Sequence, residues 1–146
     1  MVAARSSLVE LNNIRKEFGE TTAVENVSLS IKEGEFFSLV GPSGCGKTTT
    51  LRMISGFEQP TDGELYLGGK NMKATPPNDR NTNLVFQHHS LFPHMSVGEN
   101  VSYGLEKSGV SSSVQAEKVS EYLQLVDLEG FGDRNPSELS GGQQQR

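Results

Sequence analysis

Residues 41–48 read Gly-Pro-Ser-Gly-Cys-Gly-Lys-Thr, a full match to the phosphate-binding pattern G-x-x-x-x-G-K-[ST]. An apolar run at 36–40 precedes the pattern, and a segment with helical character follows at 49–55, which is the order of elements that the pattern needs. Glycines let successive backbone N–H groups curl around a phosphate, and the following helix points its positive end at the same charge. The pattern therefore predicts a bound nucleoside triphosphate, and in this order of elements it is not interpreted as a chance glycine-rich turn.

Two side chains of this loop have distinct expected roles. The Lys47 ammonium places a positive charge between the β- and γ-phosphates, and the Thr48 hydroxyl is a ligand for Mg²⁺. Lys47 is therefore a catalytic candidate and Thr48 a metal-binding candidate. The loop residues expected to bind the nucleotide are Gly41, Pro42, Ser43, Gly44, Cys45, Gly46, Lys47, Thr48 and Thr49.

Three further segments carry groups that suit the same chemistry. Phe18 lies beside Gly19 between two expected strands and can stack on a purine, although core packing is the commoner role of an isolated aromatic. Gln87 ends an expected strand, where its amide can reach Mg²⁺ or an attacking water, and a solvated glutamine is the alternative. Residues 139–146 read Leu-Ser-Gly-Gly-Gln-Gln-Gln-Arg, which indicates a second anion-binding nest at the first turn of a helix.

Composition favours a globular protein of the cytosol. The chain has 146 residues, of which 34% are hydrophobic, and no apolar run approaches the ~18 residues of a membrane span. Its first residues lack the apolar segment of a secretory signal, and Cys45 is the only cysteine, which fits a reducing compartment. The net charge of -5 argues against a protein that coats nucleic acid, because phosphate backbones are held mainly by Lys and Arg.

Periodicity predicts a strand-rich first part and a helical second part. A capping box, Ser96 with Glu99, predicts a helix over 97–106, and a second box, Ser112 with Gln115, predicts another helix with one apolar face. That face carries Val119, Tyr122, Leu123 and Val126. The expected strands are 8–14, 27–31, 36–40, 64–67 and 83–87, and the expected helix after the phosphate-binding loop is 49–55.

Together, GPSGCGKT, VFQ followed by LFPHMSVGENV, and LSGGQQQR resemble the nucleotide-binding subunits of ATP-binding-cassette (ABC) transporters. The similarity covers 8–146 and is greatest to importers of the polyamine, iron(III) and maltose group. It implies the α/β fold of an ABC-type P-loop NTPase, incomplete here. It also implies a β-rich nucleotide core at 1–87, with the phosphate loop and the strand that ends in Gln87, the Q-loop residue. A helical subdomain at 88–146 follows and ends at the signature motif of the family, which reads LSGGQ here.

The resemblance also implies partners and roles. Phe18 stacks on adenine and Gln87 senses Mg²⁺ and the γ-phosphate, which reverses the alternatives given above for both residues. Two subunits dimerise head to tail, so that Ser140, Gly141, Gly142 and Gln143 of one chain complete the ATP site of the other. Residues 88–95 meet a membrane-spanning permease at the cytoplasmic face of the cell membrane, a solute-binding protein takes part indirectly, and no nucleic acid is involved.

One departure from the family concerns the segments that normally follow the signature. The sequence contains no apolar strand ending in Asp-Glu, and its histidines at 88, 89 and 94 all lie in the permease-facing segment. We therefore expect an N-terminal portion of an importer ATPase, with a polyamine as the candidate solute, that alone neither hydrolyses ATP nor folds stably. The alternatives are a non-hydrolysing half-subunit that docks on a permease or a full-length ATPase, and, disfavoured by the compact segment before the signature, a soluble ABC ATPase of DNA repair or translation.

Overall fold

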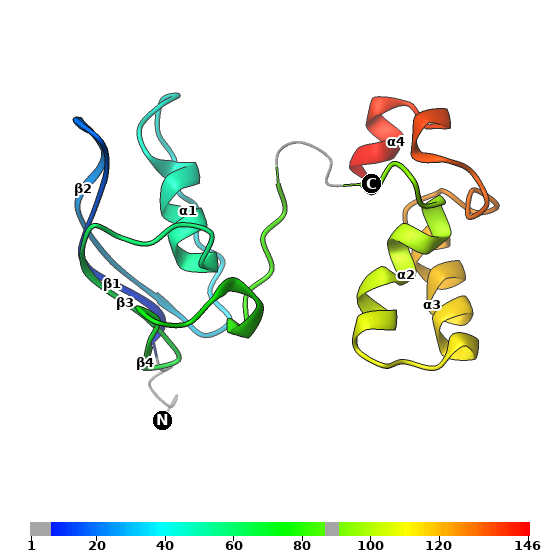
Figure 1. The fold of residues 1–146 in the computed structure, drawn as a ribbon, viewed down its shortest axis with the longest axis horizontal. Coiled ribbons are helices and arrows are strands. Elements are labelled where there is room, and N and C mark those ends of the chain that lie inside the picture. Colours follow the sequence, from blue (N-terminus) through cyan, green and yellow to red (C-terminus); the bar gives the residue numbers. More distant parts are fainter. Residues whose placement is uncertain (1–6, 87–90) are drawn as a thin grey trace. The chain divides into compact units, whose positions relative to one another are not determined.

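The computed structural model describes residues 7–86 and 91–146. The chain forms two compact units, Met1–Val85 and Phe86–Arg146. Figure 1 shows strands and a helix in the first unit and a cluster of helices in the second. Each unit is described by itself. In the described ranges, no helix is long and apolar enough to cross a membrane.

A four-stranded antiparallel sheet with the order β2-β1-β3-β4 forms the framework of the first unit (Figure 1). The strands are β1 (Ser7–Phe18), β2 (Thr21–Lys32), β3 (Asp62–Leu67) and β4 (Lys70–Asn71). β1 lies between β2 and β3, so that Leu11 faces both Leu29 and Leu65. The three strands predicted at 8–14, 27–31 and 64–67 are therefore confirmed as β1, β2 and β3, while β4 was not predicted.

A β-bulge in β1 decides which side chains reach the core. Leu11 and Ile14 are both buried although strict alternation would put them on opposite faces. The register shifts between them, and Asn13 adopts a left-handed φ of 50°. The extra residue returns Ile14 to the core face, where both side chains pack with Val24, Leu65 and Met72 from the sheet side and with Met53.

Met53 belongs to α1 (Lys47–Ser55), the helix after the phosphate-binding loop, and its side chain is fully buried. The helix predicted at 49–55 is thus confirmed and begins two residues earlier. Burial of a methionine side chain of this size contributes about 1.5–3 kcal/mol, which fixes α1 on the sheet. A short 3-10 helix, η1 (Pro77–Asp79), follows β4 and leads into the buried Arg80.

The second unit contains α2 (Val97–Lys107), α3 (Ser112–Leu125), η2 (Pro136–Glu138) and α4 (Gly141–Gln145). The predicted capping box of α2 is confirmed: Ser96 Oγ accepts from the Glu99 N–H, and Glu99 accepts from the Ser96 N–H at 2.6 Å. The core of this unit consists of Val97, Leu123, Leu128 and Leu139.

The second predicted capping box is wrong. The N-cap of α3 is Ser111, not Ser112, and its side chain caps no N–H. The Gln115 side chain instead donates through Nε2 to the Val110 carbonyl at 2.6 Å, a contact outside the predicted box. The apolar face is confirmed in part, because Leu123 is buried and Val119 and Val126 pack against the core, whereas Tyr122 is 41% exposed.

Two predicted strands are also wrong. Residues 36–40 form no strand, and Phe36 and Val40 are 94% and 89% exposed. Residues 83–86 form none either, and Val85 is 92% exposed. The physical reason is pairing: an isolated apolar run cannot satisfy its backbone groups as a strand, and none of the described segments pairs with either run.

Candidate nucleotide-binding site

The phosphate-binding loop ends in a left-handed glycine that starts α1. Gly46 is the N-cap residue with a φ of 87°, and Gly44 has a φ of 82°. A Cβ at Gly46 would lie 2.5 Å from the Ala23 carbonyl oxygen and 2.9 Å from Val24 Cγ2. Only glycine satisfies both the backbone conformation and this close approach to β2, so the sheet directly sets where the helix begins.

The N-terminus of α1 leaves its first N–H groups free to bind an anion. No side chain caps the helix, and its first turn contains no acidic residue. Early helix N–H groups without an intrahelical acceptor, together with the positive end of the helix dipole, bind phosphate oxygens. Of the nine loop residues predicted to contact nucleotide, Gly41–Cys45 are exposed, and Lys47 and Thr48 begin the helix.

The Lys47 ammonium lies over the loop. It donates to the carbonyl oxygens of Gly41 and Pro42 at 2.7 Å each, and to Cys45 Sγ at 3.3 Å. These bonds close the loop into a ring around the ammonium. The positive charge is therefore placed beside the glycine N–H groups, where a phosphate oxygen would meet both.

Two of the three threonines that follow Lys47 serve different purposes. Thr48 is exposed near the start of α1, so its hydroxyl is accessible to a metal ion that bridges to phosphate. Thr50 is buried and donates to the Gly46 carbonyl at 2.9 Å, which holds the first turn. In the described ranges, no group of three His, Cys, Asp or Glu side chains could hold a metal by itself. One hydroxyl fits Mg²⁺, which usually keeps several waters and binds through substrate phosphates.

Phe18 is the last residue of β1 and is 48% exposed, which leaves an aromatic surface for a purine. The Lys16 ammonium lies 4.7 Å from the centroid of its ring. Phe18 belongs to the same unit as the phosphate-binding loop, and its base-stacking role stays a prediction. The involvement of Lys16 was not predicted, although residues two apart in a strand share a face.

The residues of the signature segment lie in the second unit. Ser140 is the N-cap of α4: its hydroxyl accepts from the Gln143 N–H, and Gln143 accepts from the Ser140 N–H at 2.9 Å. Gly141 and Gly142 begin the helix and carry no side chain that could cover its N–H groups. Gln144 anchors the segment by donating to the Pro136 carbonyl at 2.8 Å. The nucleotide role of 140–143 stays a prediction.

Gln87 and the histidines at 88 and 89 lie outside the described residues. The rest of the predicted permease-facing segment, 91–95, is held by Asn100 of α2. The Asn100 side chain accepts from the Phe92 N–H at 2.8 Å and donates to the carbonyl oxygens of Phe92, Met95 and Ser96. The ring centroids of His94 and Phe92 lie 5.9 Å apart.

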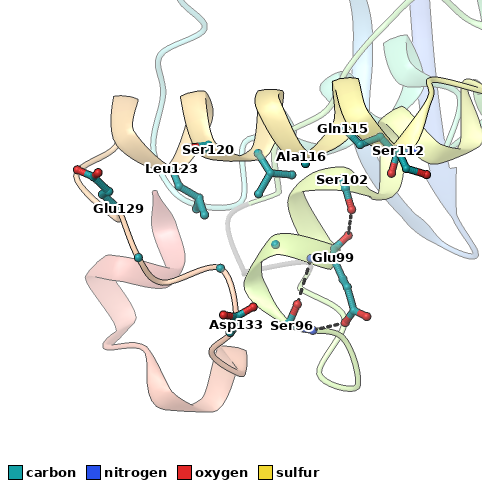
Figure 2. Close-up of a pocket in the computed structure, with 14 residues that line it drawn as sticks. Ser96, Glu99, Ser102, Ser112, Gln115, Ala116, Ser120, Leu123, Glu129 and Asp133 are labelled. Carbon is teal, nitrogen blue, oxygen red and sulfur yellow. Dashed lines mark hydrogen bonds between the residues drawn. The ribbon is translucent and has the colours of Figure 1, made fainter.

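A separate cleft of about 500 Å³ lies in the second unit between α2, α3 and the segment around 129–133 (Figure 2). Glu99, Glu129 and Asp133 bring carboxylates to it, as Figure 2 shows. Glu99 already caps α2, so its carboxylate is committed to the helix N-terminus. We assign the cleft no part in nucleotide binding.

Comparison with known proteins places this geometry in a family. The model of the family "ABC transporter" matches residues 24–146. The chain belongs to the ABC transporter family, and its fold is the α/β fold of an ABC-type P-loop ATP-binding domain. The family resemblance and the fold class predicted from the sequence are therefore confirmed.

Two groups of importer proteins are similar to the chain. It is 57% identical over 142 residues to the spermidine/putrescine import ATP-binding protein PotA of Rubrobacter xylanophilus, covering 97% of this chain and 38% of that protein. It is 50% identical over 146 residues to the Fe(3+) ions import ATP-binding protein FbpC of Agrobacterium fabrum, covering 100% of this chain and 41% of that protein. The chain thus spans about two fifths of the length of these relatives.

A solved structure is also similar. The dimeric post-hydrolysis state of the ATP-binding cassette MJ0796 bound to ADP and Pi matches with a TM-score of 0.83 and 35% identity, over 93% of this chain and 65% of that chain. Because the match covers 93% of this chain, it includes residues of both units.

Proposed function

We propose that this chain is the ATP-binding component of an ABC importer, which couples ATP binding and hydrolysis to the uptake of a small solute. The observation that carries the proposal is the glycine-ended loop at the uncapped start of α1, with the Lys47 ammonium inside it. In this arrangement the loop N–H groups and Lys47 hold the β- and γ-phosphates, and Thr48 holds Mg²⁺. Phe18 stacks on adenine, and Gln87 contacts Mg²⁺ and the attacking water.

The experiment is an equilibrium titration of the purified protein with ATP in the presence of Mg²⁺. Lys47→Ala should weaken binding about 100-fold or more, because charge-assisted bonds to two phosphates are lost at once. Lys70→Ala, which removes an exposed lysine from β4, is the matched control and should leave the affinity unchanged. Equal affinities of the Lys47→Ala variant and the unchanged protein would refute the proposal.

The proposed partners follow from the family and its relatives. Two copies dimerise head to tail, so that residues 140–143 of one copy complete the ATP site of the other. Residues 88–95 meet a permease at the cytoplasmic face of the membrane, and a solute-binding protein acts upstream. The names of the PotA relatives support a polyamine as the solute, and those of the FbpC relatives support ferric iron instead.

Two measurements separate these proposals from the non-hydrolysing alternative. Uptake of radiolabelled spermidine and of ferric iron is compared in cells with and without the gene, and loss of spermidine uptake alone supports the polyamine. Phosphate release by the full-length ATPase that contains this chain is compared with its Lys47→Ala variant. Release no higher than in the variant, with ATP binding intact, would favour a subunit that docks without turning over ATP.

A further inference from the structure

The ring of Phe18 is covered on one side by an ammonium group that is itself firmly held. Lys16 Nζ lies 4.7 Å from the ring centroid, within the range of a cation–π contact. The same ammonium donates to the Gln59 carbonyl at 2.8 Å and pairs with Glu58 at 3.2 Å. The Lys16 side chain is only 14% exposed. These two oxygen atoms fix the ammonium of Lys16 over one face of the Phe18 ring.

The anchor of Lys16 is the segment that leaves α1. The Glu58 N–H donates to the Arg52 carbonyl in the last turn of α1, and the Arg52 guanidinium lies 3.9 Å from the Glu58 carboxylate. Two more bonds join this segment to the end of β1: Thr61 N–H donates to the Arg15 carbonyl at 2.8 Å, and Glu17 N–H donates to Thr61 Oγ1 at 3.0 Å. The segment therefore ties the end of β1 to the helix that begins at the phosphate-binding loop.

We propose that Lys16 is a positioning residue for the nucleotide base: through its contacts with Glu58 and Gln59 it holds the Phe18 ring where adenine stacks and sets that ring relative to α1. The inference rests on the proposed ATP binding. One face of the ring meets the ammonium, and the 48% of Phe18 that remains exposed receives the base. Lys16 touches no reacting atom, and it acts only through Phe18.

The test is a double-mutant cycle read with two ligands, MgATP and magnesium tripolyphosphate, by equilibrium titration. Lys16→Met keeps the aliphatic stem and removes the charge, and should weaken MgATP about three- to tenfold, the range of a partly desolvated cation–π contact. Phe18→Ala should weaken it about five- to 150-fold, the range of a lost base–aromatic stack. Both variants should leave tripolyphosphate binding unchanged, because it has no base.

The diagnostic result is the coupling between the two substitutions. If Lys16 acts through Phe18, the double variant binds MgATP as the Phe18→Ala variant does. Lys16→Arg keeps the cation and should retain most of the affinity, and Lys70→Met is the matched control for the loss of one lysine. Glu58→Gln removes the charged member of the two anchors without changing Lys16 and should reproduce part of the selective loss, so the test holds even where Lys16→Met fails to fold.

Two results would overturn the inference. Lys16→Met could weaken MgATP and tripolyphosphate equally, which would assign it a general electrostatic or folding role. It could also weaken MgATP further in the Phe18→Ala background, which would give it a contact of its own. Failure of the proposed function gives a different result: the unchanged protein would then bind neither MgATP nor tripolyphosphate.

Discussion

Replacing Arg80 with methionine tests what holds α1, and with it the phosphate-binding loop, on the sheet. Arg80 is 6% exposed, and its guanidinium donates four hydrogen bonds, all to backbone carbonyls. Two of these acceptors, Met53 and Ile54, lie at the end of α1, where the Met53 carbonyl also accepts from the Gly56 N–H that caps the helix. The others are Met72 at 2.9 Å and Thr75 at 2.9 Å. In the described part of the chain, no carboxylate pairs with Arg80.

The expected cost follows from these four contacts. Burial lowers the pKa of Arg80 from its ordinary value, yet a guanidinium stays charged at any working pH. The Met53 and Met72 carbonyls keep the N–H donors of Gly56 and Thr75, whereas the Ile54 and Thr75 carbonyls lose the Arg80 donor. Each lost bond to the charged guanidinium costs about 1 kcal/mol or more, and removal of a buried cation returns part of the sum. Arg80→Met should therefore lower the free energy of unfolding by about 3–5 kcal/mol. The stability of Arg80→Lys should lie between those of the unchanged protein and Arg80→Met, because one ammonium cannot reach four carbonyls.

Urea unfolding followed by circular dichroism measures this change. The matched control is Arg52→Met, whose guanidinium is 46% exposed and 3.9 Å from Glu58, and it should change stability by less than about 1 kcal/mol. An Arg80→Met variant as stable as the Arg52→Met control would refute the reasoning.

Three further outcomes are expected. Maleimide should label the exposed Cys45, and MgATP at ten times its Kd should slow labelling about tenfold; an unchanged rate would show that the loop does not enclose phosphate. Asn100→Ala should raise hydrogen exchange at the Phe92 amide about tenfold or more, whereas Ser102→Ala should not. Ser140→Asp preserves the cap of α4 but sets a carboxylate against phosphate, so sedimentation should show no MgATP-dependent dimer. Dimerisation as before would contradict the head-to-tail proposal.

The sequence predicts those elements whose signals are local. The α2 helix follows from Ser96 and Glu99, three residues apart, and the loop at 41–48 follows from one contiguous pattern. The same reading fails at Ser112, because whether Ser111 or Ser112 caps α3 depends on where Gln115 points. A capping pattern alone does not decide between two adjacent serines.

The failures elsewhere involve partners that are distant in the sequence. An apolar run such as 36–40 becomes a strand only where another strand accepts its hydrogen bonds, and periodicity carries no information about that partner. Arg80 forms hydrogen bonds to residues between five and 27 positions away. No sequence motif predicts a guanidinium that bonds only to backbone carbonyls. The bulge at Asn13 likewise shifts Ile14 to the core without a sequence signal that alternation could reveal.

These contacts explain why the phosphate-binding loop keeps its geometry although residues 36–40, directly before it, form no strand. The start of α1 is fixed by Gly46 against Ala23, its middle by the buried Met53, and its end by Arg80. All three contacts are to the unit built on the antiparallel sheet, and none involves residues 36–40. The second half of the loop is therefore set by the sheet, whereas Gly41 and Pro42 are held by the Lys47 ammonium. A bound phosphate would compete with both carbonyls for that ammonium, so we expect any change on nucleotide binding to fall in the first half of the loop and not at the start of α1.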